Sequence, residues 1–290
     1  IVLDAEERGV FEPGGLIVEG TAGNTGIGLA LVGRARGYRT LILIPDTQSQ
    51  EKMDALRLCG AEVRAVPAVP YRDPDNYVHQ AERAATELAP SEPHGVLYAN
   101  QWDNVANRDG HAASTGPEIW KQTDGTVDGF TCAVGTGGTL AGVSAYLKNK
   151  NPNVVIAAAD PMGAAIYSWI KTGDLKSEGS SITEGIGQGR ITGNLEGAPI
   201  DTQFRVSDEE GLEWVARLLR EEGLCLGLSS GINVAGAIAL GKQLVAEGRE
   251  NPRVATILCD TGFRYLSTLY NAEWLASKKL PVFDWLQSGD

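Results

Sequence analysis

Short apolar runs alternate with amphipathic stretches along almost the whole chain. The apolar runs are continuous, as in strands buried on both faces of a parallel sheet, and they predict strands at residues 16–19, 40–44, 61–66, 95–99, 130–134, 154–160 and 254–258. Helical periodicity lies between them, at about residues 26–36, 49–58, 76–88, 109–121, 138–149, 208–222 and 231–247. This order predicts an α/β fold with doubly wound, mainly parallel sheets covered by helices.

A polar stretch near residues 100–109 separates two such series, and each series has its own glycine-rich turn. We therefore predict two domains, residues 1–104 and 105–290. Residues 1–8 have the pattern of a helix and lack the apolar core of a secretory signal. Residues 173–199 are rich in Gly, Ser and Thr without periodicity, which predicts a functional loop. Ser207 and Glu210 have the spacing of a capping box.

Composition narrows the function classes. The formal net charge of −12 argues against a non-specific nucleic-acid binder, and no apolar run approaches the ~18 residues of a membrane span. The four cysteines are widely spaced beside apolar residues, and we interpret them as buried free thiols: Cys59, Cys132, Cys225 and Cys259. The three histidines are scattered, so we predict no metal site. A reducing, cytoplasmic compartment fits this pattern best.

Two glycine-rich turns, residues 19–26 and 135–139, each follow a predicted strand and lead into a predicted helix. A helix N-terminus presents unpaired N–H groups and the positive end of the helix dipole, so it attracts anions. Two such turns suggest two anionic groups bound at once. The alternative is a tight strand–helix turn without a ligand. The second turn is not a Walker A loop, because no Lys-Ser/Thr pair closes it.

Three weaker signals leave alternatives open. Gly23, Gly26 and Gly28 have G-x-x-G-x-G spacing rather than the dinucleotide pattern, although Asp46 lies about twenty residues further on. Residues 229–231, Ser-Ser-Gly, precede a predicted helix and can simply cap it. Residues 183–189 are too rich in glycine for regular structure, which indicates a hinge or a binding loop.

Taken in detail, the chain resembles the pyridoxal-phosphate enzymes of the tryptophan-synthase-β structural type (fold type II). It is most similar to cysteine synthase (O-acetylserine sulfhydrylase) and its relative cystathionine β-synthase. The resemblance extends over essentially the whole chain, and six segments carry it: residues 20–30, 115–120, 135–139, 184–189, 229–231 and 262–267. It implies a cofactor cleft between a smaller, mobile N-terminal domain and a larger cofactor-binding domain.

The resemblance also implies roles for individual residues. The cofactor phosphate would bind at Gly135, Thr136, Gly137, Gly138 and Thr139. Ser229 would face the pyridine nitrogen, and Asn24 would lie near the ring hydroxyl. The substrate carboxylate would bind among Thr21, Ala22, Gly23, Asn24, Thr25 and Gln101. Gly185 would contribute backbone near the substrate amine.

The implied reaction is β-replacement. An activated serine such as O-acetylserine loses its α-proton and its leaving group, and sulfide then adds to give L-cysteine. One alternative is the condensation of serine with homocysteine by a cystathionine β-synthase. A second is a lysine-less pseudoenzyme that binds an amino acid or a peptide. The resemblance further implies a homodimer and a possible serine acetyltransferase partner.

The chain departs from the family pattern at the lysine that forms the Schiff base with the cofactor. None of the nine lysines occupies that place, and we expect this residue just upstream of Ile1, so that the chain alone is inactive. Ala22 stands where many members have serine. Arg190 and Ile191 replace an apolar pair, and the guanidinium would favour a more anionic donor such as O-phosphoserine, or an acidic acceptor. The alternative is an exposed loop arginine.

Overall fold

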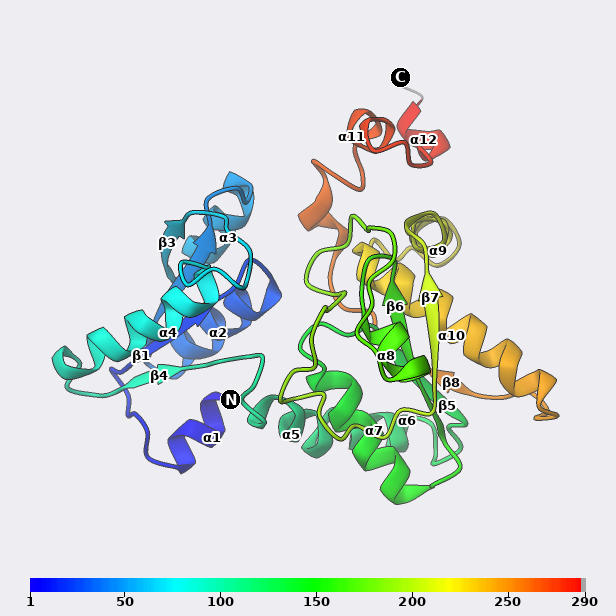
Figure 1. The fold of residues 1–290 in the computed structure, drawn as a ribbon, viewed down its shortest axis with the longest axis horizontal. Coiled ribbons are helices and arrows are strands. Elements are labelled where there is room, and N and C mark those ends of the chain that lie inside the picture. Colours follow the sequence, from blue (N-terminus) through cyan, green and yellow to red (C-terminus); the bar gives the residue numbers. More distant parts are fainter. Residues whose placement is uncertain (288–290) are drawn as a thin grey trace. The chain divides into compact units, whose positions relative to one another are not determined.

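The computed structural model describes residues 1–287 of the chain. It divides into two compact units, Ile1–Ala106 and Asn107–Asp290, and each contains one four-stranded sheet (Figure 1). Every strand pair in both sheets is parallel, and helices connect the strands, so the predicted α/β class with parallel sheets is confirmed. The roles of the two domains stay predictions.

Unit 1 contains a sheet with strand order β3-β2-β1-β4. The strands are β1 (Leu16–Gly20), β2 (Arg39–Pro45), β3 (Glu62–Val66) and β4 (Val96–Tyr98). The helices are α1 (Val2–Glu7), α2 (Asn24–Ala35), α3 (Gln50–Leu58) and α4 (Tyr77–Leu88), followed by a 3₁₀ turn at Ala89–Ser91. Successive residues of β1 point to opposite faces: Val18 packs in a cluster with Ala81 of α4, while Ile17 packs in a cluster with Leu29 of α2. Burial on both faces explains the continuous apolar runs.

Unit 2 contains a sheet with strand order β7-β6-β5-β8. The strands are β5 (Gly129–Cys132), β6 (Val155–Pro161), β7 (Thr202–Val206) and β8 (Val254–Ala255). The helices are α5 (Ala106–Ala113), α6 (Thr115–Gln122), α7 (Gly138–Lys150), α8 (Ile166–Thr172), α9 (Asp208–Glu222), α10 (Leu228–Ala246), α11 (Ala272–Ser277) and α12 (Asp284–Gln287), with a 3₁₀ turn at Gly262–Tyr265. One cluster, including Phe130, Leu140 and Leu147, packs α7 on the sheet, and another, including Ala159, Val215 and Ile232, packs α9 and α10.

Local signals place the helix starts. Ser49 caps α3 and Asn76 caps α4 through their side-chain oxygens. The capping box at Ser207 and Glu210 is present at the start of α9, as predicted. Residues 174–201 form no helix or strand, which agrees with the predicted loop.

Several predicted elements were wrong in their limits. Strand β7 was missed because its residues are half-buried and partly polar at the edge of the sheet, so they form no apolar run. The single helix predicted at residues 109–121 is two helices, which a backbone break at Ser114 separates. Helix α10 begins at Leu228, so Ser229 and Ser230 lie inside its first turn and do not cap it. Helices α8, α11 and α12 were not predicted.

The cysteine prediction holds only in part. All four cysteines are free, but burial was predicted for each, and only Cys132 is buried. Cys259 is exposed because strand β8 is only two residues long and the chain leaves the sheet before this residue.

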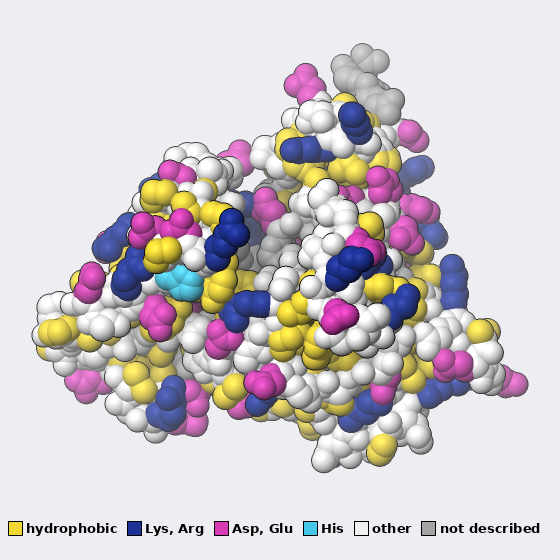
Figure 2. Space-filling model, in the orientation of Figure 1, with side chains coloured by type: hydrophobic (Ala, Val, Ile, Leu, Met, Phe, Trp, Pro, Cys, Tyr) yellow, Lys and Arg dark blue, Asp and Glu magenta, His cyan; other side chains and the backbone are white. Residues whose placement is uncertain are grey.

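Within residues 1–287, no helix combines the length and the apolarity that a membrane crossing requires. Acidic and basic side chains are intermixed on the face in Figure 2 rather than gathered by sign.

Candidate active site

The turn after β5 forms a cup of backbone N–H groups. Gly137 has φ 85° and precedes α7, which begins at Gly138 without a side-chain cap. Among residues 1–287, the N–H groups of Gly135, Thr136 and Gly137 donate no hydrogen bond. The N–H of Gly138 donates to Oγ1 of Thr136, at 3.3 Å. Free donors at the start of a 13-residue helix are suited to an anion.

The glycine loop at 184–189 packs directly on this turn. A Cβ atom added at Gly135 would lie 2.4 Å from the carbonyl oxygen of Gly185, so only glycine fits there. The N–H of Gly187 donates to the carbonyl of Val134, at 2.9 Å. Two segments that the sequence singled out separately are therefore neighbours in unit 2.

Three side chains that sequence reasoning missed hold the cup in shape. Nδ2 of Asn107 donates to Oγ1 of Thr136 at 2.9 Å, and Oγ1 of Thr192 donates to the carbonyl of Thr136 at 2.5 Å. Nε2 of His111 lies 3.1 Å from Oγ1 of Thr139. Asn107 and His111 are four residues apart on one face of α5, and this polar spacing was the available signal.

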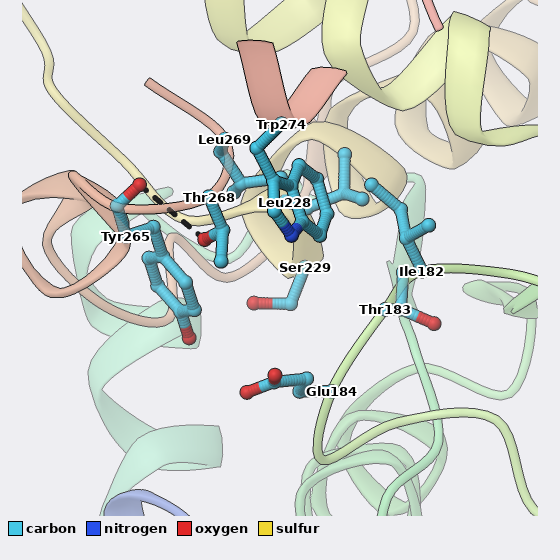
Figure 3. Close-up of a pocket in the computed structure, with 9 residues that line it drawn as sticks. All are labelled: Ile182, Thr183, Glu184, Leu228, Ser229, Tyr265, Thr268, Leu269 and Trp274. Atoms are coloured by element: carbon cyan, nitrogen blue, oxygen red, sulfur yellow. Dashed lines mark hydrogen bonds between the residues drawn. The ribbon is translucent and has the colours of Figure 1, made fainter. Parts of the chain in front are cut away.

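A pocket in unit 2 contains the predicted Ser229 (Figure 3). Nine residues line it: Ile182, Thr183, Glu184, Leu228, Ser229, Tyr265, Thr268, Leu269 and Trp274. The Ser229 hydroxyl and the Glu184 carboxyl both point into the interior, and the Tyr265 hydroxyl points toward the same space. Burial, together with the neighbouring Asp260, raises the pKa of Tyr265, so this phenol stays protonated at neutral pH. The Tyr265 hydroxyl donates to Oδ2 of Asp260 at 2.7 Å, so toward a ligand it can only accept. The pocket therefore offers a ligand the Ser229 hydroxyl, the Glu184 carboxyl and the acceptor oxygen of Tyr265.

Buried polar groups fix the backbone around Ser229. Oγ of Ser230 accepts from the Cys259 N–H at 2.9 Å. Oδ1 of Asn233 accepts from the Ala133 N–H at 2.6 Å, and its Nδ2 donates to the carbonyl of Ile257 at 2.7 Å. Asn233 is 1% exposed, so α10 is joined to the ends of β5 and β8 by one satisfied side chain.

The other predicted set lies in unit 1, at the start of α2. The helix begins at Asn24 and not at residue 26, and its N-cap Gly23 is extended and lacks a side-chain cap. Oγ1 of Thr21 accepts from the Gly23 N–H at 3.2 Å. Oγ1 of Thr25 donates to Oε1 of Gln101 at 2.5 Å. The structure thus brings Gln101, which follows β4, to the glycine turn that follows β1, and Ala22 is half-buried in the same turn.

Glu19 lies beside this second site and contacts Gln101. It is the fourth residue of β1 and is fully buried, and its Oε2 accepts from the Gln101 N–H at 3.4 Å. Burial raises the pKa of its carboxyl to about 8, although hydrogen bonds from Gln101 and Asn100 act in the opposite direction. The sequence analysis placed Glu19 at the end of a strand and the start of the glycine-rich turn and gave it no role. The signal was a carboxylate in an otherwise apolar run.

The residues of unit 2 fit a pyridine ring that carries a phosphate. The three free N–H groups of the glycine turn match the acceptor oxygens of a phosphate, and Ser229 supplies a hydroxyl for a ring nitrogen. None of the nine lysines of the chain lines the pocket of Ser229.

Comparisons with known proteins show the family of the chain. The family model for pyridoxal-phosphate dependent enzymes matches residues 1–260. The chain is 50% identical to cysteine synthase 1 of Neurospora crassa over 285 residues, which are 97% of this chain and 73% of the relative. It is 50% identical to cysteine synthase 1 of Emericella nidulans, covering 97% and 75%, and 37% identical to cysteine synthase A of Escherichia coli, covering 97% and 84%. The chain belongs to the family of pyridoxal-phosphate dependent enzymes that includes the cysteine synthases.

Proposed function

We propose that this protein makes L-cysteine by β-replacement, from O-acetylserine or a similar activated serine and sulfide. The observation that carries the proposal is the N–H cup at Gly135–Gly137, which is packed against the loop that also brings Glu184 to the pocket of Ser229. The cysteine synthase relatives at 50% identity support the same reaction.

In this proposal, residues Gly135 to Thr139 bind the cofactor phosphate and Ser229 hydrogen-bonds the pyridine nitrogen. Pyridoxal phosphate supplies the electron sink that stabilises charge at the substrate α-carbon. Because serine is neutral, it leaves the ring a milder sink than a carboxylate partner would, which favours elimination of the leaving group. Asn24 is assigned to the ring hydroxyl.

The substrate carboxylate is assigned to the start of α2. Thr21, Gly23 and Thr25 lie at this helix start, where the Gly23 N–H and the Thr25 hydroxyl now donate to Thr21 and Gln101 and would turn to the substrate. The backbone of Gly185 is assigned to the substrate amine. Ala22 lacks the hydroxyl that a serine would offer at the same place.

Finer features remain part of the proposal. They are a homodimer, docking of a serine acetyltransferase, a cytoplasmic location and a Schiff-base lysine outside the nine described above. The free state of all four cysteines supports a reducing compartment.

The test uses the protein in a form that carries the proposed Schiff-base lysine, purified with its cofactor, and it compares three reactions. Cysteine formation from O-acetylserine and sulfide is the expected result, and replacing Ser229 with alanine is expected to lower kcat at least tenfold. Ser91→Ala, in the exposed turn after α4, is the matched control and should retain full activity. Faster conversion of serine and homocysteine would instead assign the cystathionine reaction. Amino-acid binding without turnover would assign a binding protein. A preference for O-phosphoserine that Arg190→Ala abolishes would assign that donor.

A further inference from the structure

Glu19 occupies a position where stability alone favours an apolar residue. It lies in the central strand β1, is 0% exposed, and its neighbours in the strand are Val18 and Gly20. Its Oε1 atom has no hydrogen-bond partner among residues 1–287. A buried polar group that is only partly satisfied destabilises a fold, whereas a leucine of similar volume would pack against the same core. The carboxyl therefore needs an explanation other than packing.

The second oxygen of Glu19 binds the turn that carries Gln101. Oε2 accepts from the Gln101 N–H at 3.4 Å, and the Gln101 side chain and the backbone N–H of Asn100 also act on this carboxyl. Asn100 has φ 45°, a left-handed conformation that non-glycine residues rarely adopt. A buried acceptor that faces two consecutive N–H groups stabilises this conformation, because both donors would otherwise lack this partner.

The same turn has its own internal hydrogen bonds, which close it beyond Gln101. The Asn104 N–H donates to the carbonyl of Asn100 at 2.9 Å, and Nδ2 of Asn104 donates to the carbonyl of Ala99 at 3.1 Å. Hydrogen bonds close the turn on both sides, and the Gln101 side chain is directed toward Thr25. Its Oε1 accepts a hydrogen bond from the Thr25 hydroxyl. Glu19 therefore reaches the proposed substrate contact through one intermediate residue. It binds Gln101, and the Gln101 side chain in turn binds Thr25.

We propose that Glu19 is a positioning residue for the substrate carboxylate, acting through Gln101 and the backbone of Asn100. This inference rests on the proposed function, since it assigns the carboxylate site to Thr25 and Gln101. Glu19 makes no contact with the substrate in this role. Its effect is to keep the Gln101 side chain in the one orientation that pairs it with Thr25.

The experiment measures binding of L-cysteine to the purified holoenzyme by calorimetry, and hydrogen exchange of the Gln101 amide without any amino acid. Glu19→Leu removes the acceptor, and we expect at least a tenfold rise in the dissociation constant, a similar rise in KM for O-acetylserine, and a kcat within twofold. Glu19→Gln keeps an acceptor and is expected to bind within about threefold of wild type. Glu62→Gln, an exposed glutamate of the same sheet, is the matched control.

A double-variant cycle with Gln101→Ala separates positioning from a general structural role. If Glu19 acts through Gln101, Glu19→Leu should weaken binding less than twofold once Gln101 is alanine. An equal loss in both backgrounds overturns the inference, as does unchanged exchange at Gln101. If Glu19→Leu does not fold, Glu19→Asp takes its place, because it withdraws the carboxyl by one methylene. Binding of L-cysteine by Glu19→Asp as tight as by wild type would also overturn the inference.

The outcomes for the proposed function are distinct from these. A wild-type protein that binds L-cysteine but forms none from O-acetylserine and sulfide contradicts the proposed reaction, while the binding and exchange measurements still decide the role of Glu19. A wild-type protein that binds no amino acid overturns the inference itself.

Discussion

Oγ1 of Thr139 lies 3.1 Å from Nε2 of His111, and the other ring nitrogen of His111 lies 2.9 Å from Oγ1 of Thr115. The imidazole therefore links the first turn of α7 to the first residue of α6. Burial lowers the pKa of His111, so the ring is neutral at pH 7 and donates through one nitrogen while accepting through the other. The Thr139 hydroxyl is held in place at the N–H cup by a group that carries no charge.

Replacing His111 with alanine should weaken the binding of pyridoxal phosphate about fivefold, the equivalent of one lost hydrogen bond of roughly 1 kcal/mol. The loss follows because Thr139 is free to rotate away from the phosphate. Fluorescence titration of the apoprotein with the cofactor measures it. His79→Ala, on the surface of α4, is the control and should bind as wild type does. Equal affinity in the His111 variant would show that the ring does not support the cup.

Gly135→Ala should abolish cofactor binding within the range of a micromolar assay. The added Cβ would lie 2.4 Å from the carbonyl oxygen of Gly185, which is backbone and cannot rotate aside, so the loop at 184–189 must move off the cup. Gly110→Ala is the matched control, because a Cβ on this helical glycine meets nothing within 4 Å. The cofactor absorbance that remains after dialysis gives the readout. A Gly135 variant that retains cofactor would place the phosphate elsewhere.

The glycine turns were predictable because their signal is local: a strand, small residues and a helix in succession. The side chains that hold these turns in shape could not be predicted from the sequence. Asn107 lies 29 residues from Thr136 and Thr192 lies 56 residues from it, and no single sequence shows that such residues meet. The same limit applies to Glu19, whose partner Gln101 is 82 residues away.

The fold errors also have physical causes. Continuous apolar runs indicated the other strands, including the edge strands β3, β4 and β8, but β7 combines an edge position with polar, half-buried side chains and has no such run. Ser229 resembled a helix cap because serine before an apolar stretch has that role in many helices. In the structure Gly227 is the N-cap, and Ser229 is available to line a pocket instead.

Asn233→Ala should destabilise the protein by about 1–2 kcal/mol, since it leaves the partly buried Ala133 N–H and Ile257 carbonyl without this partner. Urea unfolding, followed by tryptophan fluorescence, measures this change. Asn153→Ala, at an exposed position before β6, should change stability by less than about 0.5 kcal/mol. If both variants unfold at the same urea concentration, Asn233 does not join α10 to the sheet in the way described.

The buried Glu19 should also make stability depend on pH, and the direction follows from its raised pKa. The carboxyl titrates near 4.5 in the unfolded chain and near 8 in the folded one, so the folded state binds the extra proton between these values. The free energy of unfolding should therefore fall as pH rises from 4.5 to 8, by at most about 1.4 kcal/mol per pH unit, and be level beyond. Tyr77 and Tyr98 face this carboxyl, and their raised pKa values keep both neutral throughout the window.

Glu19→Gln cannot titrate, so its stability relative to wild type should increase steadily between pH 5 and pH 8 in urea unfolding. A constant difference across that range would mean that Glu19 is already ionised in the folded protein at pH 5.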